Sequence, residues 1–455
     1  MSSQNKESGS PPVGLALAGG SGLRARPLTL ASPDYRRSKA AIRLAGRSLI
    51  DWEVGALARQ GVTRLYVVAN GRENRAQTRL LLGDGERHGV SVRYSRPRFD
   101  AQNTGSGQAT LRALEHWELD GPVLVFPTDS LFDFSLDALV AAHREQGAVV
   151  TVATVARTPR EAARKYGVLR LDGQRVLGFR EKPEASEAEA IAREAGRGDG
   201  LVDVNAGMYL VDGARLRALA GTPRLTGLAR TRLDWGGDLL PYLVEQGEPV
   251  AAHRIARFGD LGAPADYLET LGDLLRGRFP LLADGLGPAL DAAGSVRIHD
   301  SSLRRPDPAT GLTLAQKLEA GIVRIGPHVR IGRDVEIGPG AWIEDSDVGD
   351  GVDLGAGVVL RGSACADHAI VGTGARLVDA FVGFMAVVDS TADRRTVLSG
   401  HTALGDEARI EAGARLHGVH VYPGVRIAAD TPVPPGSVFE ATPARELAAV
   451  GEGVH

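Results

Sequence analysis

The sequence predicts two folds in succession, a doubly wound, mostly parallel α/β domain and then a parallel β-helix. Two observations carry this prediction. Up to about residue 279, short apolar runs alternate with amphipathic stretches, which is typical of parallel strands covered by helices on both faces. Beyond about residue 320 the apolar residues recur every six positions instead. That shorter period indicates short strands stacked in coils.

The strands of the first domain are predicted from nearly uninterrupted apolar runs. They are Val13–Ala18, Leu65–Ala69, Pro122–Phe126 and Val149–Ala153. The amphipathic stretches 49–60, 107–117 and 136–146 are the helices expected between them. The stretch 184–200, rich in Ala, Glu and Arg, is predicted as an exposed helix or loop. A doubly wound sheet binds its ligand at the carboxyl ends of its strands.

The coils of the second domain are predicted from two interleaved sets of apolar residues. One set is Val329, Val335, Ala341, Val352 and Val358; the other is Ile325, Ile331, Ile337, Ile343, Leu354 and Leu360. Glycines follow the second set and suit the corners. The pattern weakens after residue 369 and returns over 404–427. The stretch 381–399 between them is either a loop or an irregular coil.

These patterns divide the chain into five segments. We expect a polar tail over 1–12, the α/β domain over 13–280 and a connector over 281–320. The β-helix is expected over 321–440 and a second tail over 441–455. With 53 basic and 56 acidic residues, nothing in the charge favours a nucleic acid or a membrane surface as partner. A single cysteine, Cys365, excludes an intramolecular disulfide and fits a cytoplasmic protein.

The most informative motif is a glycine-rich turn that follows the first strand. Leu17 and Ala18 lead into Gly19, Gly20 and Gly22, and the basic residues Arg24 and Lys39 follow. Backbone amides exposed in such a turn, together with two cations, suit a polyphosphate. The alternative is a tight turn with a structural role alone.

The order of residues in this stretch resembles the sugar-1-phosphate nucleotidyltransferases, the nucleotide-sugar pyrophosphorylases. The matching text is Leu-Ala-Gly-Gly-x-Gly from Leu17, Pro27-Leu28-Thr29 and Lys39. It departs at Leu23, where the family has threonine, and in a longer stretch before Lys39 that includes residues 34–37. Later matches follow in the family's order: Tyr166-Gly167-Val168, Glu181-Lys182-Pro183, Asn205-Ala206-Gly207-Met208-Tyr209 and Phe258-Gly259-Asp260-Leu261-Gly262. ADP-glucose and GDP-mannose enzymes are the members it resembles most.

The six-residue period of the second domain resembles the left-handed β-helix of hexapeptide-repeat proteins. The nucleotidyltransferase resemblance implies a reaction. A sugar-1-phosphate or cyclitol-1-phosphate attacks the α-phosphorus of a nucleoside triphosphate (NTP) and expels pyrophosphate, with Mg²⁺ as cofactor. It implies that Leu17, Ala18, Gly19, Gly20 and Gly22 bind the nucleotide, and that Arg24 and Lys39 hold the triphosphate.

For the metal, the resemblance implies that Asp129 and Asp260 are the Mg²⁺ ligands. Asp129 follows the strand Pro122–Phe126 directly. An aspartate at such a place can instead cap the next helix. For Asp260, the motif resemblance extends to Tyr267, with Ala263 in place of the family's threonine.

On the sugar side, the resemblance implies that Gly167, Glu181, Lys182 and Asn205 bind the sugar phosphate, with Lys182 on its phosphate. The alternative for Glu181 and Lys182 is a surface ion pair. Asp234 and Trp235 are expected to shape the wall beside the sugar. The base is the open point, since Asn103 replaces a family glycine. Gln102 and Thr104, Arg98 or a backbone amide are the candidates.

Two other functions are considered. One is a catalytically silent, regulatory homologue that binds a nucleotide sugar. The other is a second, acyl-transfer activity in the β-helix, for which His401, His417 and His420 are candidate bases. We expect the β-helix to serve as an assembly surface, so that the protein is a homo-oligomer. We expect the product to be an ADP- or GDP-linked sugar or cyclitol, and the sequence leaves the identity of that sugar or cyclitol undecided.

Overall fold

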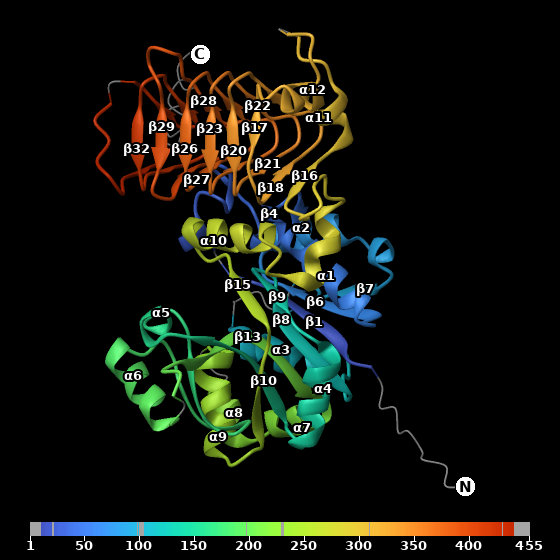
Figure 1. Ribbon diagram of the computed structural model, residues 1–455. Helices are drawn as coiled ribbons and strands as arrows, with labels where there is room; N and C mark the ends of the chain where they lie inside the picture. The colour runs from blue at the N-terminus through green and yellow to red at the C-terminus, as the bar shows by residue number, and fades with distance from the viewer. Residues whose placement is uncertain are drawn as a thin grey trace, which may run out of the picture. The chain divides into compact units, whose positions relative to one another are not determined.

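Figure 1 shows the computed structural model. It describes residues 11–20, 22–97, 99, 104–196, 198–228, 232–308, 310–429 and 431–440. These residues form two compact units. The first comprises 11–20, 38–41 and 48–259, and the second 22–37, 42–47 and 260–440. Across these described ranges, every helix is too short or too polar to cross a membrane.

The first unit is built on a nine-stranded sheet. In spatial order its strands are β10 (Val150–Arg157), β14 (Val250–Arg254), β12 (Arg175–Arg180), β11 (Val168–Asp172), β13 (Val202–Asp212), β8 (Pro122–Pro127), β1 (Val13–Ala18), β6 (Arg64–Ala69) and β7 (Ser91–Tyr94). The strands β8, β1, β6 and β7 are parallel to one another. The strand β13 is antiparallel to β8, β10 and β11.

The sheet is therefore mixed: the strands around β1 are parallel, and so are β10 and β14, but the pairings of β11, β12 and β13 are antiparallel, unlike the mostly parallel sheet that the sequence predicts. The reason lies in a short connection. Strands β11 and β12 form a hairpin, with Asp172 paired to Arg175, and a tight turn can only join antiparallel strands.

Helices cover both faces of this sheet, as expected for a doubly wound domain. Alternate residues of β1 enter two separate cores: Ala16 and Ala18 belong to one, Val13 and Leu15 to the other. The first core takes in α1 (Leu49–Arg59) and α4 (Leu136–Glu145), and the second takes in α3 (Ser106–His116), α7 (Gly213–Ala220), α8 (Pro223–Leu228) and α9 (Leu240–Glu245). The first core also includes Leu82 of α2 (Arg72–Leu82), Ala162 of α5 (Pro159–Ala162) and Ala192 of α6 (Ala185–Glu194).

The strand order reverses at β1. The chain passes from β1 to β6 and β7 on one side, and then returns to place β8 on the other side of β1. Leu17 near the end of β1 pairs with Val68 of β6 and with Pro127 of β8. The carboxyl ends of three parallel strands thus meet at one edge, where a topological switch point opens a crevice.

The second unit contains three sheets that the chain visits in turn. The first coil sheet is β16 (Val296–Ile298), β18 (Val329–Ile331), β21 (Asp347–Val348), β24 (Ala364–Cys365), β27 (Ala380–Val382), β30 (Thr402–Leu404), β33 (His420–Val421) and β35 (Val438–Phe439). The second coil sheet is β17 (Arg324–Ile325), β20 (Trp342–Glu344), β23 (Val359–Arg361), β26 (Arg376–Val378), β29 (Val397–Ser399) and β32 (Arg415–His417). The third coil sheet is β19 (Glu336–Ile337), β22 (Asp353–Leu354), β25 (Ile370–Val371), β28 (Val387–Val388), β31 (Arg409–Ile410) and β34 (Arg426–Ile427).

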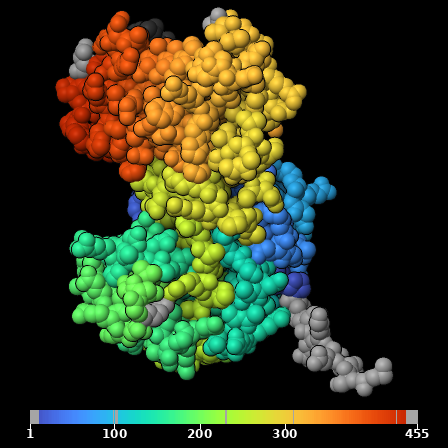
Figure 2. Space-filling model, in the orientation of Figure 1, coloured from blue at the N-terminus to red at the C-terminus, as the bar shows by residue number. Residues whose placement is uncertain are grey.

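Each coil returns to the same sheet after about three strands, and every pairing is parallel. Trp342 pairs with Val359, and Val359 with Arg376, at an interval of 17 residues. Val329, Ile343, Leu354 and the other inward residues form one continuous buried core. This path is compatible with the predicted β-helix, and its residues form one continuous body in orange and red in the space-filling view (Figure 2).

Two stretches that lacked the six-residue pattern also belong to the coils. The stretch 381–399 carries β28, β29 and most of β27, so it is an irregular coil, with its longer connection over 389–396. Within 281–320, β16 pairs with β18, and this stretch also holds α11 (Asp300–Arg304) and α12 (Leu314–Glu319). Cys365 is buried in β24.

Other segments of the second unit pack on the coils. The helix α10 (Pro264–Leu275) carries Tyr267, whose hydroxyl donates to the Arg43 carbonyl at 3.0 Å and whose ring lies edge-on to Phe381. The side chain of Arg37, next to the short hairpin of β2 (Leu30–Ser32) and β3 (Tyr35–Arg36), forms an ion pair with Asp406. Residues 22–37 and 42–47 of this unit are thereby held against the coils.

Candidate active site

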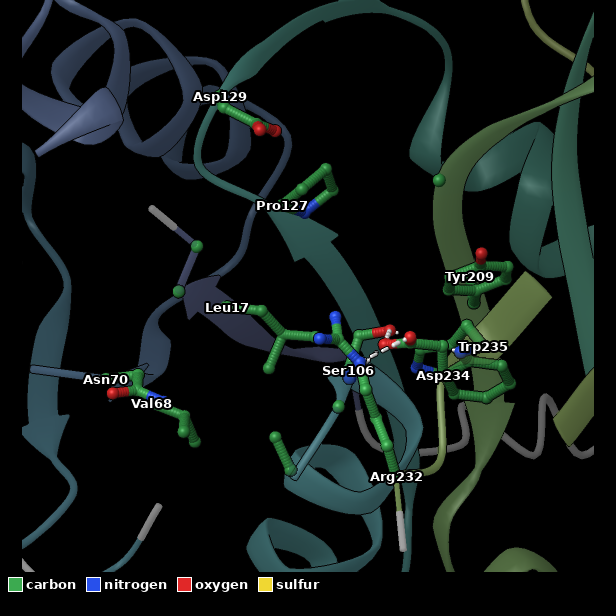
Figure 3. Close-up of a pocket in the computed structure, with 15 residues that line it drawn as sticks. Leu17, Val68, Asn70, Ser106, Pro127, Asp129, Tyr209, Arg232, Asp234 and Trp235 are labelled. Carbon is green, nitrogen blue, oxygen red and sulfur yellow. Dashed lines mark hydrogen bonds and ion pairs between the residues drawn. The ribbon is translucent and has the colours of Figure 1, made fainter. Parts of the chain in front are cut away.

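The crevice at the switch point contains a cavity of about 280 Å³. Figure 3 shows Val68 and Asn70 on one side of it and Tyr209, Asp234 and Trp235 on the other, with Asp129 near one end. The lining is Leu17, Gly19, Gly20, Val68, Asn70, Gly105, Ser106, Ala109, Pro127, Asp129, Gly207, Tyr209, Arg232, Asp234 and Trp235. Gly19 and Asn70, which directly follow β1 and β6, and Pro127, which ends β8, are all in this lining. A ligand site at a switch point is built from such strand ends.

The glycine-rich turn forms part of this lining. Gly20 has a φ of +105°, a conformation open to glycine, and no atom lies within 4 Å of the place where its Cβ would be. A ligand can therefore approach the backbone of Gly19 and Gly20 closely. Ala18 is buried at the end of β1, and its carbonyl accepts a hydrogen bond from the backbone N–H of Asn70 at 3.0 Å.

Gly22, the last glycine of the motif, lies in the second unit and has a structural partner. Its carbonyl accepts the Thr29 hydroxyl at 2.7 Å, and its φ is +62°. A methyl group on Gly22 would lie 2.8 Å from Cγ2 of Thr29. The threonine of the Pro27-Leu28-Thr29 motif thus holds the turn closed.

Lys39 and Asp129 meet in the first unit. The Nζ of Lys39 lies 2.7 Å from Oδ2 of Asp129, and both side chains are largely shielded from solvent. Lys39 begins the 3-10 turn Lys39–Ala41, whose preceding residue Ser38 donates its amide to Gln77 of α2 at 2.8 Å. Despite the longer stretch before it, Lys39 therefore brings a cation to the cavity beside a carboxylate.

Arg24 and Asp260 lie in the second unit, on either side of Gly262. The Gly262 amide donates to Oδ1 of Asp260 at 2.9 Å. A methyl group on Gly262 would lie 3.1 Å from the Asp260 carboxylate and 3.4 Å from the Arg24 guanidinium. The absence of a side chain at Gly262 is what allows the cation and the carboxylate to flank it.

The wall opposite β6 is made by the start of α3 and the segment Leu233–Trp235. The Ser106 amide donates to Oδ1 of Asp234 at 3.1 Å, and the Trp235 amide donates to the Ser106 hydroxyl at 3.1 Å. A carboxylate at a helix N-terminus is favourable because the first amides of the helix lack partners. Arg232 donates from Nε to Oδ2 of the same aspartate at 2.8 Å. Asp234 thus orders both Arg232 and α3 at the rim.

Two stacked aromatic rings form the far side of the cavity. Tyr209 and Trp235 have ring centroids 4.3 Å apart and an angle of 17° between planes. The Nδ2 of Asn205 donates to the Tyr209 hydroxyl at 2.9 Å. Burial raises the pKa of the Tyr209 hydroxyl well above its ordinary value, and the nearby carboxylates of Glu181 and Asp234 add to this, although the Asn205 bond opposes it. Tyr209 therefore acts as a neutral hydroxyl.

The residues predicted for the sugar phosphate lie together. The backbone N–H of Asn205 donates to the Gly167 carbonyl at 2.8 Å. A methyl group would lie 2.9 Å from Oε2 of Glu181 if placed on Gly167, and 2.7 Å from it if placed on Gly236. Both glycines therefore leave room for that carboxylate. Lys182 has its Nζ 3.5 Å from Oε1 of Glu181 and a φ of +44°.

Of the candidates for recognising the base, Thr104 lies within the described residues. Gln102 and Arg98 lie outside the described residues. Thr104 is buried, and its carbonyl accepts the Leu233 amide at 2.9 Å. It does not line the cavity, whereas its neighbours Gly105 and Ser106 do.

Sequence reasoning missed Asn70, Ser106 and Arg232 as lining residues. Asn70 directly follows the predicted strand Leu65–Ala69, so the rule that ligands meet strand ends could have found it. Ser106 stands between two glycines at a helix start, which is also a readable signal. Nothing near Arg232 in the sequence marks it.

Of the two carboxylates that the resemblance implies as metal ligands, Asp129 lies in the first unit and Asp260 in the second. Asp129 and Asp260 each end or follow a strand, and carboxylate oxygens are the donors that Mg²⁺ prefers. Within the described residues, His, Cys, Asp and Glu side chains form no metal-binding group of three or more. Mg²⁺ retains several waters and takes phosphate oxygens, so one or two carboxylates are sufficient.

Comparison with known proteins identifies the family of the chain. The family described as "Nucleotidyl transferase" matches residues 13–277. Since this is more than half of the chain, the protein belongs to that family.

Three individual relatives show the same likeness, two over most of their length and one over less than half. A UTP–glucose-1-phosphate uridylyltransferase of Synechocystis sp. is 26% identical over 83% of this chain and 88% of its own. A mannose-1-phosphate guanyltransferase of Gibberella zeae is 27% identical over 92% and 98%, respectively. A glucose-1-phosphate adenylyltransferase of Vibrio vulnificus is 29% identical over 39% of this chain and 44% of its own.

Proposed function

We propose that the protein is a Mg²⁺-dependent sugar-1-phosphate nucleotidyltransferase that releases pyrophosphate and forms a nucleoside-diphosphate sugar. One observation carries the proposal. A single cavity joins the glycine-rich turn and Asp129, which suit a nucleotide, to Tyr209 and Trp235. The Tyr209 hydroxyl in turn accepts a hydrogen bond from Asn205, one of the residues predicted to bind the sugar phosphate. The site thus offers a phosphate end and a polar, aromatic end in one crevice.

The predicted roles follow from charge and position. Lys39 lies beside Asp129 at the cavity, and we assign Lys39 and Arg24 to the triphosphate. Lys182, exposed and next to Glu181, is assigned to the phosphate of the sugar substrate. Glu181 and Asn205 offer acceptors and a donor to sugar hydroxyls. We assign Asp129 and Asp260 to the metal.

The reaction needs alignment more than a nucleophilic side chain. An oxygen of the sugar phosphate forms a bond to the α-phosphorus while the bond from that phosphorus to the pyrophosphate oxygen breaks. Negative charge then accumulates on the leaving pyrophosphate. Lys39 and Arg24 counter that charge. A bound Mg²⁺ supplies further neutralisation of phosphate oxygens.

The identities of the nucleotide and of the sugar phosphate are the next part of the proposal. The three relatives are named for uridylyl, guanylyl and adenylyl transfer. We keep ADP or GDP formation as the proposal, with a sugar-1-phosphate or a cyclitol-1-phosphate as acceptor. We further propose that the coils form a left-handed β-helix, that the protein works in the cytoplasm and that it self-associates through the coils.

The test is pyrophosphate release with Mg²⁺ across a grid of five nucleoside triphosphates and several hexose- and cyclitol-1-phosphates. We expect release for ATP or GTP with one acceptor. The Asp129→Asn variant, run beside the wild type, should show no release at any Mg²⁺ concentration. Binding of a nucleotide sugar with silence across the whole grid would instead support the regulatory homologue and overturn the proposal.

A further inference from the structure

The outer face of the third coil sheet shows an ordered change of charge. In each of its strands the second residue is buried in the core, so the first residue faces outward. From β19 to β34 these outward residues are Glu336, Asp353, Ile370, Val387, Arg409 and Arg426. These outward strand residues therefore run from acidic at one end, through apolar in the middle, to basic at the other end.

At the acidic end, like charges lie near one another. Glu336 forms an ion pair with Arg305 at 2.8 Å. Asp353 is exposed, and the pKa of its carboxyl is raised, mainly by partial burial and further by the charges of Glu336 and Asp307. A cation brought to Asp353 would relieve that repulsion.

At the basic end, the arginines have donors to offer. Arg409 contacts Asp389 through Nε at 2.9 Å, and Arg426 contacts Glu411 through Nε and Nη2. Their side chains remain 52% and 65% exposed. A guanidinium has five N–H donors, so each can also bind an external carboxylate.

The middle of the face is apolar and accessible. Ile370 is 45% exposed, and at the adjoining corner Phe384 and Met385 are 38% and 51% exposed. Large apolar side chains with this much exposure are typical of surfaces that bind a partner when they gather in one place. Here they gather on neighbouring coils at the centre of the gradient.

We propose that this face is a two-fold interface that binds a second copy of the chain with the coils antiparallel. A two-fold axis between β25 and β28 sets Asp353 against Arg409 of the partner subunit and Glu336 against Arg426 of the partner subunit. Ile370 then meets Val387 of the partner subunit. In a two-fold interface each contact occurs twice. Parallel packing of the same faces would instead set acid on acid and base on base.

The inference specifies the face and symmetry of the expected self-association, and it does not depend on the proposed reaction. The full-length protein is examined by sedimentation velocity at low micromolar concentration and physiological salt. We expect a dimer. The variants D353K and R409E should each raise its dissociation constant by at least about 100-fold, because each sets like charges together twice. R376E, an exposed arginine on the second coil sheet, should leave the dimer intact.

Mixing the two variants separates a lost interface from a damaged fold. In a mixed pair the lysine introduced by D353K meets the glutamate introduced by R409E, and the other contact keeps its native aspartate and arginine. Dimer should therefore return on mixing. A monomeric wild type, dimeric single variants or a mixture that stays monomeric would each overturn the proposal. Pyrophosphate release, measured separately on the same samples, reports on the proposed function without bearing on the interface.

Discussion

Lys182 holds a backbone conformation that lysine rarely adopts. Its φ of +44° lies in the left-handed region, which costs a residue with a side chain roughly 1–2 kcal/mol. Strain of this kind gathers at functional sites, where the surrounding structure holds it. Here it accompanies an exposed ammonium beside Glu181. We interpret Lys182 as held in place for an anionic substrate.

Removing that ammonium should weaken one substrate only. Lys182→Ala is expected to raise the KM for the sugar phosphate by about 10–100-fold, since a hydrogen bond to a charged group contributes roughly 1.5–3 kcal/mol. The KM for the nucleoside triphosphate should stay within about twofold. Steady-state kinetics with each substrate varied in turn checks this, with Arg180→Ala, an exposed cation at the end of β12, as the control. Equal effects on both KM values would refute the assignment.

Glu53 is a buried acid that contacts the strand directly after Asp129. It lies in α1 at 2% exposure, and its carboxyl accepts the Phe132 amide at 3.1 Å. Phe132 belongs to β9 (Ser130–Asp133), which directly follows Asp129. Burial raises the pKa of this carboxyl well above its usual range, and the Phe132 bond only partly offsets the effect. Burial thus favours the protonated form of Glu53, and its carboxyl fixes the strand after Asp129 through the Phe132 amide.

A raised pKa in the folded state has a defined sign for stability. The contribution is fully present below the pKa of the unfolded chain and is lost as the pH rises through the folded pKa. Glu53→Gln keeps the acceptor and carries no charge in either state. Its thermal midpoint should therefore fall less steeply with rising pH than that of the wild type. Melting curves over about pH 5–9 test this; the exposed Glu145→Gln should follow the wild type.

At the scale of elements, the meeting of α3 with Leu233–Trp235 shapes the cavity wall. Gly105 makes this possible. Its φ is +102°, and a methyl group there would overlap the Leu233 carbonyl. The indole nitrogen of Trp235 donates to Thr110 one turn further along α3, at 2.9 Å. The wall is thus fixed at two successive turns of one helix.

Gly105→Ala should therefore cost more than strain alone. We expect a loss of about 2–5 kcal/mol in the free energy of unfolding, from backbone strain and overpacking together, and a lower kcat/KM. Gly61→Ala is the matched control, because Gly61 has a φ of +88° but no atom within 4 Å of the added methyl. It should lose only about 1–3 kcal/mol. Urea denaturation of both variants gives the comparison; equal losses would mean that the Leu233 contact is unimportant.

Local pattern was enough to predict many elements of this fold. The apolar runs correspond to β1, β6, β8 and β10, and the amphipathic stretches to α1, α3 and α4. Both apolar sets of the coils are buried over 329–360. These predictions succeeded because each rests on neighbours within one strand, helix or coil.

What the sequence could not provide were contacts between distant segments. Asp234 bonds Ser106 across 128 positions, and no local periodicity encodes such a pairing. The antiparallel half of the main sheet was missed for the same reason, since the partner of β13 is chosen by packing. Arg232 joined the site only through its bond to Asp234.

At the scale of the whole molecule, the coils hold a segment that also carries Arg24. Within the second unit, Arg37 forms an ion pair with Asp406 and donates from Nη1 to the Leu28 carbonyl at 3.1 Å. Arg26 lies over the Tyr422 ring at 5.8 Å from its centroid. The long stretch before Lys39 therefore has a structural role, because it ties residues 22–37 to β30 and β33.

Asp406 is the anchor of this connection. Its side chain is only 6% exposed, and its carboxylate also accepts the Phe384 amide at 3.2 Å. Burial raises the pKa of the Asp406 carboxyl, while the Arg37 guanidinium lowers it in part. Without Arg37 the carboxylate would lose its charged partner, and the segment that carries Arg24 would lose its fixed position.

Arg37→Ala should consequently affect the nucleotide and not the sugar. We expect the KM for the nucleoside triphosphate to rise by about 3–10-fold, the range for losing roughly 0.7–1.4 kcal/mol of positioning energy, with the KM for the sugar phosphate unchanged. Arg36→Ala, on the exposed strand β3 beside it, is the control for loss of a nearby positive charge. If Arg36→Ala and Arg37→Ala raise the nucleotide KM equally, the effect is one of net charge, and the coils have no part in placing Arg24.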